Sequence, residues 1–191
     1  MNGSNTSSGA DKQLVEACRK GDRSAQVRLY SLYAKPMFNS AFRVLGNRQE
    51  AEEAMHDGFL AAFQKIDSFD GTSVFCHWLR KIVVNKSIDY LRKRKGLVFD
   101  EISGVLRELP DDMEEENEFM AAAPEQISML LGTLNHHYRI VLSLHLLEGY
   151  SHEEIAKELG MTYGSVRTCY SRARKALQEK VKQHFNSILL N

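Results

Sequence analysis

The stretch Ser151–Leu177, SHEEIAKELGMTYGSVRTCYSRARKAL, predicts two helices joined by a tight turn. Ser151, followed three residues later by Glu154, forms a capping box that satisfies backbone N–H groups at the start of a helix. Gly160 can adopt the left-handed conformation that ends this helix, and Thr162 can cap the next one. The stretch therefore indicates a helix-turn-helix.

The two faces of this motif differ in their chemistry. Ala156, Gly160 and Val166 supply the small residue, the turn glycine and the branched residue facing back that a helix-turn-helix needs. The opposite face of the second helix carries hydroxyl and basic groups, which suit base edges and phosphates in a DNA major groove. A plain helical hairpin with solvated charges is the alternative, but the turn, the caps and the basic face agree on DNA recognition. The candidate residues are Tyr163, Gly164, Ser165, Arg167, Thr168, Ser171, Arg172 and Lys175.

The rest of the chain also has the pattern of an all-α protein. Glycine and proline are sparse inside the periodic segments, and no segment alternates apolar and polar residues for long. Asp70 and Gly71 mark a loop at 67–73, and Asn47 with Glu50 predicts the capped start of a helix. The expected helices are 12–20, 24–33, one from near Pro36 toward Gly46, one from Asn47 to Ile66, and 75–95.

The net charge of zero conceals an uneven distribution along the 191 residues. Residues 1–95 contain 16 Lys and Arg against 10 Asp and Glu, whereas 96–126 contain 1 against 10 and 127–191 contain 8 against 5. Because like charges repel, the acidic segment is expected to be an extended or loosely ordered linker. We therefore predict two small helical domains at 12–95 and 127–185, an acidic linker at 96–126, a flexible tail at 1–11 and a second tail at 186–191.

Several classes of protein do not fit this sequence. No run approaches the roughly 18 apolar residues of a membrane span, and the first residues lack the pattern of a secretory signal. Three cysteines without a CxxC pair do not make a disulfide framework. No HExxH, P-loop or GxSxG motif occurs, and His145 and His152 stand seven apart without a carboxylate at ligand spacing. We expect a cytoplasmic protein that is not an enzyme and that has no cofactor, no metal and no direct membrane insertion.

One side of the long helix 75–95 carries Trp78, Lys81, Asn85 and Arg92. Apolar residues cover most of its other sides, so the helix is expected to be largely buried and its polar strip is informative. Aromatic, amide and basic groups side by side can stack on unstacked bases and hydrogen-bond to them. A core tryptophan beside a solvated strip accounts for the same residues equally well, and the strip alone leaves both interpretations open.

The preceding helix carries a stripe of a different kind, made of Glu53, Asp57, Leu60 and Gln64. An acidic stripe interrupted by a leucine fits a protein partner better than it fits nucleic acid. A solvated helix face is the simpler alternative, and the stripe alone does not exclude it.

Two blocks of the sequence resemble one protein family. The segments 51–69 and 75–95, AEEAMHDGFLAAFQKIDSF and FCHWLRKIVVNKSIDYLRKRK, are similar to regions 2.2 to 2.4 of bacterial extracytoplasmic-function (ECF) sigma factors, which belong to the sigma-70 family. The segment 131–177, LGTLNHHYRIVLSLHLLEGYSHEEIAKELGMTYGSVRTCYSRARKAL, resembles region 4 of the same family. A lone helix-turn-helix is a weak signal, whereas both blocks in order across an acidic linker are specific. By this resemblance the first domain is a region 2 helical bundle and the second a region 4 helix-turn-helix.

The resemblance implies a sigma factor that binds core RNA polymerase and directs it to promoter DNA. Region 2 would recognise and melt the −10 element, while region 4 would read the −35 element and dock on the β-subunit flap. The residues implied to bind the clamp helices of the β′ subunit are Glu53, His56, Asp57 and Leu60. The residues implied at the −10 element are Phe69, Asp70, Ser73, Trp78, Lys81, Asn85 and Arg92.

The chain departs from the family pattern at a few positions. His56 stands where the family usually has glutamine, and an imidazole can also donate and accept hydrogen bonds. Val84 replaces a commonly basic residue next to Asn85, which weakens the case for a phosphate contact there. The family also implies an anti-sigma protein as inhibitor.

The competing function is that of an ordinary helix-turn-helix transcription regulator that acts without binding polymerase. Such a regulator would need a ligand-binding or dimerisation domain. Residues 12–95 show no obvious pocket motif and no heptads, so this alternative lacks support in the first domain.

Overall fold

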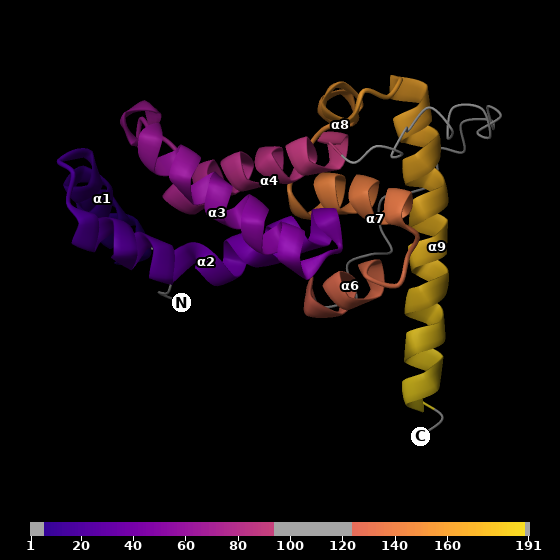
Figure 1. The fold of residues 1–191 in the computed structure, drawn as a ribbon. Helices are drawn as coiled ribbons and strands as arrows, with labels where there is room; N and C mark the ends of the chain where they lie inside the picture. Colours follow the sequence, from indigo (N-terminus) through magenta and orange to yellow (C-terminus); the bar gives the residue numbers. More distant parts are fainter. Residues whose placement is uncertain (1–5, 94–123, 190–191) are drawn as a thin grey trace. The chain divides into compact units, whose positions relative to one another are not determined.

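The computed structural model describes residues 6–93 and 124–189, and the chain divides into two compact units, Met1–Lys93 and Arg94–Asn191 (Figure 1). Every regular element in the described ranges is a helix, which confirms the all-α prediction. The predicted linker, 96–126, lies almost entirely outside the described residues. None of the described helices is long and apolar enough to cross a membrane.

Unit 1 is built from three long helices and two shorter elements in its described residues. α2, α3 and α4 pack against one another (Figure 1). α3 and α4 approach closely at Gly58, where an added Cβ would lie 2.5 Å from Cγ2 of Val83. The elements are α1 (Thr6–Arg19), α2 (Arg23–Leu45), α3 (Arg48–Gln64), the 3₁₀ turn η1 (Ile66–Ser68) and α4 (Phe75–Lys93).

α2 is one continuous helix, whereas the sequence predicted a break near Pro36. A proline inside a helix lacks the N–H that would bond to the carbonyl four residues earlier, at a cost of about 3 kcal/mol. Pro36 is exposed, but Leu29, Met37 and Ala41 are fully buried on either side of it. Burial of this apolar stripe offsets the lost hydrogen bond, so tertiary packing overrides the local signal.

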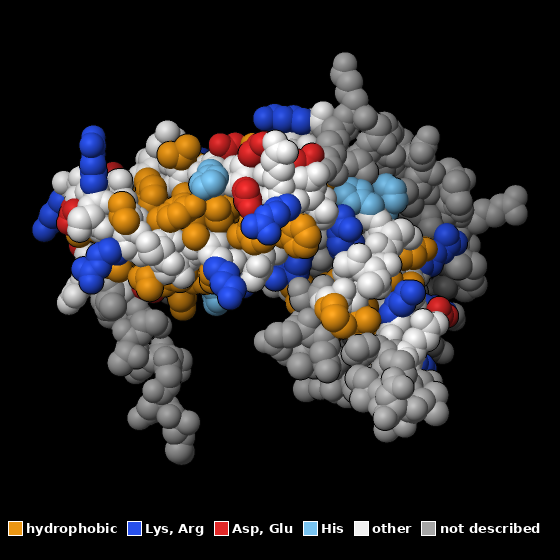
Figure 2. Space-filling view, turned by 60° about the horizontal axis from the view of Figure 1, so that its bottom comes forward, with side chains coloured by type: hydrophobic (Ala, Val, Ile, Leu, Met, Phe, Trp, Pro, Cys, Tyr) orange, Lys and Arg blue, Asp and Glu red, His pale blue; other side chains and the backbone are white. Residues whose placement is uncertain are grey.

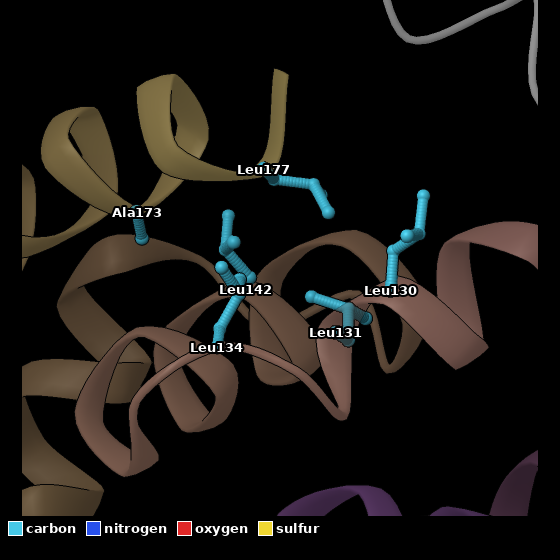
Figure 3. Close-up of a cluster of buried hydrophobic side chains, with 6 residues drawn as sticks. All are labelled: Leu130, Leu131, Leu134, Leu142, Ala173 and Leu177. Atoms are coloured by element: carbon cyan, nitrogen blue, oxygen red, sulfur yellow. The ribbon is translucent and has the colours of Figure 1, made fainter. Parts of the chain in front are cut away.

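Unit 2 carries a compact core beneath one long helix. Leu130, Leu131, Leu134 and Leu142 meet Ala173 and Leu177, which point toward them from the last helix (Figure 3). Asn135 caps the helix that carries Leu142, because its side chain accepts a hydrogen bond from the Tyr138 backbone N–H at 2.9 Å. The described elements are α6 (Pro124–Leu131), α7 (His136–Leu142), the π-helical turn η3 (Ser143–Leu147), α8 (His152–Leu159) and α9 (Tyr163–Leu189).

Helices extend further toward both ends of the chain than the sequence predicted. α1 begins at Thr6, six residues before the predicted start of the first helix. Asp11 is buried, and the hydroxyl of Tyr33 on α2 donates to its carboxylate at 2.5 Å, which ties the start of α1 to the core. α9 continues past 185 because the sequence there contains no glycine or proline to end it.

Candidate nucleic-acid and protein-binding surfaces

The helix-turn-helix in unit 2 forms as its sequence predicts. The Ser151 backbone N–H donates to the Glu154 carboxylate at 2.9 Å, and the Glu154 N–H donates to the Ser151 hydroxyl at 3.1 Å, which completes the capping box of α8. Gly160 ends α8 at a φ of +67°, a conformation that glycine adopts without strain. The Ser165 N–H donates to Oγ1 of Thr162 at 3.1 Å and so caps α9. Local interactions therefore set the geometry of the turn.

The eight predicted DNA-binding residues lie together on the first part of α9. Ala156 of α8 and Val166 of α9 are buried, as the motif requires, so the opposite side of α9 is turned away from the core. Steps of three and four residues along a helix place side chains in adjacent rows on one face. Tyr163, Gly164, Arg167, Ser171 and Lys175 are exposed, and Ser165, Thr168 and Arg172 are half-buried beside them.

Interactions within α9 restrain several of these side chains. The Arg167 guanidinium lies over the ring of Tyr163, 5.9 Å from its centroid. The Thr168 hydroxyl donates to the Gly164 carbonyl at 2.9 Å, so its oxygen can meet DNA only as an acceptor. Together with the cation of Lys175, this face carries the groups that phosphates and base edges require.

A cluster of rings beside the helix-turn-helix was not predicted from the sequence. The ring centroids of His145 in η3 and His152 in α8 are 4.5 Å apart, and Tyr170 of α9 lies 4.7 and 4.8 Å from them. The Nδ1–H of His145 donates to the Tyr150 carbonyl at 2.8 Å. Burial, followed by the nearby His145, lowers the pKa of His152. Within the described ranges, no group of three or more His, Cys, Asp and Glu could hold a metal.

The tryptophan of the α4 strip belongs partly to the core of unit 1. Trp78 is half-buried, and its ring centroid lies 5.3 Å from that of Phe69 and 5.6 Å from that of Phe75. Phe69 was predicted at the −10 element, but its ring is buried, with 4% of its surface exposed. Its carbonyl accepts a hydrogen bond from the Arg19 guanidinium. Phe69 therefore anchors the loop that follows it.

That loop, at 69–73, is held by hydrogen bonds of its own. The Asp70 carboxylate accepts from the Thr72 N–H at 2.9 Å and from the Thr72 hydroxyl at 2.8 Å, and these bonds lower the pKa of Asp70. Asp70 and Ser73 are both exposed. The loop therefore presents a carboxylate and a hydroxyl to solvent, next to the aromatic rings that anchor it.

The other residues of the strip follow Trp78 along α4. Lys81 and Arg92 are exposed and Asn85 is half-buried. The Arg92 guanidinium donates to the carboxylate of Asp89 at 3.4 Å, an exposed pair within the helix. The structure thus brings an aromatic ring, an amide and two cations to one side of α4, as the sequence predicted for this helix.

The residues predicted to bind a protein partner lie on one face of α3. The hydroxyl of Tyr30 on α2 lies 2.9 Å from Nε2 of His56, and the hydroxyl of Tyr90 on α4 donates to the Asp57 carboxylate at 3.2 Å. These two tyrosines were missed because their partners are 26 and 33 residues away in the chain. The predicted residues themselves, Glu53, His56, Asp57 and Leu60, are all exposed.

Hydrophobic side chains are also exposed on unit 1. Figure 2 shows such side chains spread over its helices, with basic and acidic side chains around them. Leu60, on the predicted partner face, is 61% exposed, and Val27 of α2 is 64% exposed. Contiguous apolar patches mark protein-binding sites, whereas single exposed apolar side chains are common on protein surfaces.

Two helical units, one of them presenting a helix-turn-helix with arginine and lysine side chains on its outer face, are the architecture of a DNA-binding protein. Comparison with family models is more specific. The model "Sigma-70 region 2" matches residues 29–96, and the model "Sigma-70, region 4" matches residues 125–177.

Curated relatives match nearly the whole chain. The ECF RNA polymerase sigma factor SigW of Bacillus subtilis is 30% identical over 187 residues, which cover 90% of this chain and 96% of SigW. The ECF RNA polymerase sigma-E factor of Escherichia coli K12 is 30% identical over 184 residues, which cover 90% of this chain and 94% of that protein. The chain therefore belongs to the ECF group of the sigma-70 family. It is a sigma factor that directs RNA polymerase to promoters for the initiation of transcription, and it is not an enzyme.

A solved structure supports the same fold. The structure of CnrH in complex with the cytosolic domain of CnrY has a TM-score of 0.50 and 23% sequence identity to this chain. The alignment covers 91% of this chain and 98% of CnrH. The arrangement of helices therefore has a counterpart among solved proteins.

Proposed function

We propose that unit 2 reads the −35 element of promoters and that unit 1 recognises and melts the −10 element while it binds the polymerase. The observation that carries this division is the exposed set of hydroxyl and basic side chains on α9, directly after a fully capped turn. A rigid helix with such a face suits the major groove of duplex DNA. The aromatic and amide groups on α4 suit unstacked bases instead.

Within α9, the proposed roles follow from side-chain chemistry. Arg167 can donate two hydrogen bonds to the acceptors of one guanine, and Thr168 offers an acceptor oxygen. Lys175 carries a flexible point charge that suits a phosphate. Arg167 and Thr168 are therefore proposed to specify sequence and Lys175 to position the helix. Tyr163, Gly164, Ser165, Ser171 and Arg172 complete the proposed surface.

In unit 1, the −10 surface is proposed to combine the loop with the α4 strip. Asp70 and Ser73 extend from a loop whose first residue, Phe69, packs against Trp78 in the core. Trp78 offers the exposed part of its ring for stacking, and Asn85 offers an amide for hydrogen bonds to a base. Lys81 and Arg92 supply positive charge for the strand backbone.

The exposed face of α3 is proposed as the contact with the β′ clamp helices of core RNA polymerase. Its carboxylates, Glu53 and Asp57, favour a basic partner, and Leu60 needs an apolar recess to cover it. His56 lies between them as a hydrogen-bonding group. Unit 2 is proposed to dock on the β flap.

An anti-sigma protein and a cytoplasmic location complete this proposal. Both follow from membership of the ECF group, and the cytoplasm is where core polymerase and the chromosome are found. The alternative, an ordinary helix-turn-helix regulator, is favoured by no observation on unit 1.

The test is whether the purified full chain binds bacterial core RNA polymerase and competes with the housekeeping sigma factor. We expect stoichiometric binding with competition. Asp57→Arg should weaken it at least tenfold, because a buried like-charge contact costs well over about 1.4 kcal/mol. Asp67→Arg is the matched control, since Asp67 is an exposed carboxylate of unit 1 outside the proposed face and its ion pair with Arg19 is long, at 4.0 Å. Specific duplex binding without polymerase binding would instead favour the ordinary regulator.

A further inference from the structure

Two tyrosines from neighbouring helices flank the exposed face of α3. Tyr30 on α2 reaches His56, with the two rings nearly parallel at an interplanar angle of 3° and centroids 5.9 Å apart. Tyr90 on α4 reaches Asp57, the next residue of α3, from the other neighbouring helix. The two hydroxyls therefore restrain adjacent side chains in the middle of this face.

We propose that Tyr30 and Tyr90 are positioning residues for polymerase binding, and that they hold the His56 imidazole and the Asp57 carboxylate in the orientation that the β′ clamp meets. The inference rests on the proposed function, because it concerns the same face of α3. It adds α2 and α4 to a contact that the sequence attributed to α3 alone.

Tyr30 is placed to act as a fixed support. Its ring packs at 53° on that of Phe59, with centroids 4.8 Å apart, and Phe59 is buried in the core of unit 1. When its hydroxyl donates to Nε2 of His56, the proton of the neutral imidazole lies on Nδ1. The ring then has one defined tautomer and a restricted orientation.

Tyr90 is placed to donate to Asp57. Burial, followed by the negative charge of Asp57, raises the pKa of Tyr90, so the hydroxyl keeps its proton. The carboxylate keeps further lone pairs that a basic partner can approach. Lys93 lies over the Tyr90 ring, 5.6 Å from its centroid, and adds a cation–π contact to it.

The benefit of these contacts is entropic. An exposed side chain loses rotamer freedom when a partner immobilises it, and this loss subtracts from affinity. A hydrogen bond that already restricts the side chain in the free protein reduces the loss on binding. Each tyrosine hydroxyl should therefore contribute about fivefold to polymerase affinity, the size expected for one net hydrogen bond.

The experiment compares Tyr30→Phe and Tyr90→Phe in the full chain, titrated against core RNA polymerase. Each change removes only an oxygen, and each should weaken binding about fivefold. Tyr33→Phe is the matched control, because Tyr33 lies on the same helix as Tyr30 but its hydroxyl donates to Asp11. The Tyr33→Phe variant should bind core polymerase with the affinity of the wild type. Thermal unfolding of every variant shows whether stability changes alongside affinity.

Double substitutions separate positioning from a general structural effect. Tyr30→Phe should have no further effect in a His56→Ala background, and Tyr90→Phe none in an Asp57→Ala background. His56→Gln keeps an acceptor for the Tyr30 hydroxyl, so the effect of Tyr30→Phe should persist there. If Tyr30→Phe and Tyr90→Phe weaken polymerase binding in the alanine backgrounds as much as in the wild type, the inference is overturned, because the tyrosines would then act without their partners.

The two proposals can fail separately. If Asp57→Arg weakens polymerase binding while Tyr30→Phe and Tyr90→Phe bind as the wild type does, the positioning role is overturned and the α3 contact stands. If the wild-type chain does not bind core polymerase, the proposed function is wrong and the inference fails with it.

Discussion

The DNA-reading surface of unit 2 and the binding surfaces of unit 1 are assembled in different ways. In unit 2, the proposed −35 residues all lie at 163–175 on α9, and the same helix places Ala173 and Leu177 in the core. In unit 1, the surfaces draw side chains from α2, α3, α4 and the loop after η1. A surface on one helix is defined by local sequence, whereas a surface shared among helices depends on how those helices pack. Substitutions of α9 residues that lie far apart along the helix, such as Arg167 and Lys175, should therefore act independently of one another, and those of contacting residues in unit 1 should be coupled.

The largest expected effect tests whether the two surfaces depend on separate cores. Leu142 is fully buried in the cluster beneath α9 (Figure 3). Leu142→Ala should lower the free energy of unfolding of unit 2 by about 3 kcal/mol, through lost transfer energy and the cavity left behind. Hydrogen exchange followed by mass spectrometry should show faster exchange in α7 and α9 and no change in α2–α4.

Leu79→Ala is the reciprocal variant, because Leu79 is fully buried in unit 1. It should accelerate exchange in α2–α4 and leave α7 and α9 unchanged. Faster exchange in both units from either variant would contradict separate cores and would remove the basis of the comparison.

The next effect concerns the shared surface of unit 1. Asn85→Ala should reduce recognition of the −10 element by about 2 kcal/mol, the size of a lost pair of base contacts, and should slow promoter opening. Binding to a −35 duplex should not change. A fluorescent base in the −10 element reports opening, and Asn39→Ala, at an exposed asparagine on α2, is the control. Normal opening by the Asn85 variant would show that the −10 site lies elsewhere.

Two substitutions on α9 should have smaller and distinguishable effects. Arg167→Ala should cost about 1.5 kcal/mol on the cognate −35 sequence and reduce discrimination at one base position. Lys175→Ala should weaken all duplexes alike and lower the slope of log affinity against log salt by about 0.9. Fluorescence anisotropy with cognate and altered duplexes over a salt series measures both. If the double variant loses a binding free energy that differs from the sum of the two single losses, the two α9 side chains are coupled.

The same contrast explains which features could be predicted from the sequence. Capping signals act within three or four residues, so the capping box at Ser151 and the cap at Asn47 could be predicted. The Glu50 N–H does donate to the Asn47 side chain, at 3.1 Å. The polar face of α9 could be predicted for the same reason, because its outward residues repeat with the helical period. Its role at the −35 element remains a proposal.

Features that depend on distant parts of the chain could not be predicted. The prediction of a break at Pro36 was wrong, because the apolar side chains on either side of Pro36 are buried by packing against other helices. The family resemblance implied a −10 role for Phe69, but contacts with Phe75 and Trp78 bury its ring in the core of unit 1. The partners of Tyr30 and Tyr90 both lie on α3, whereas the tyrosines themselves lie on α2 and α4. No local periodicity signals such contacts.

The smallest expected effect tests the ring cluster of unit 2, where side chains from η3, α8 and α9 meet beside the motif. Burial lowers the pKa of His152 below the ordinary histidine value of about 6.5, with His145 and Arg167 acting in the same direction and Glu153 against them. Folding therefore favours the neutral ring. The neutral His152 ring makes its full contribution to stability above a pH of about 6.5. This contribution declines as the pH falls below that value, and the decline ends below the pKa of His152 in the folded protein. Because the ring is partly solvated, the loss should stay below about 1 kcal/mol.

NMR titration of the His152 ring in the full chain should give a midpoint below about 6.5. Thermal unfolding should show that the wild type loses more stability than His152→Gln between about pH 7.5 and about pH 5.5. His77→Gln, at an exposed histidine of unit 1, should behave as the wild type does. If His152→Gln loses less stability than the wild type as the pH falls, contacts among η3, α8 and α9 support the motif. The surface of unit 2 then depends in part on packing between elements, as the surfaces of unit 1 do. If His152 titrates with a midpoint of about 6.5 and all three proteins lose the same stability, the α9 surface depends only on its own helix and caps.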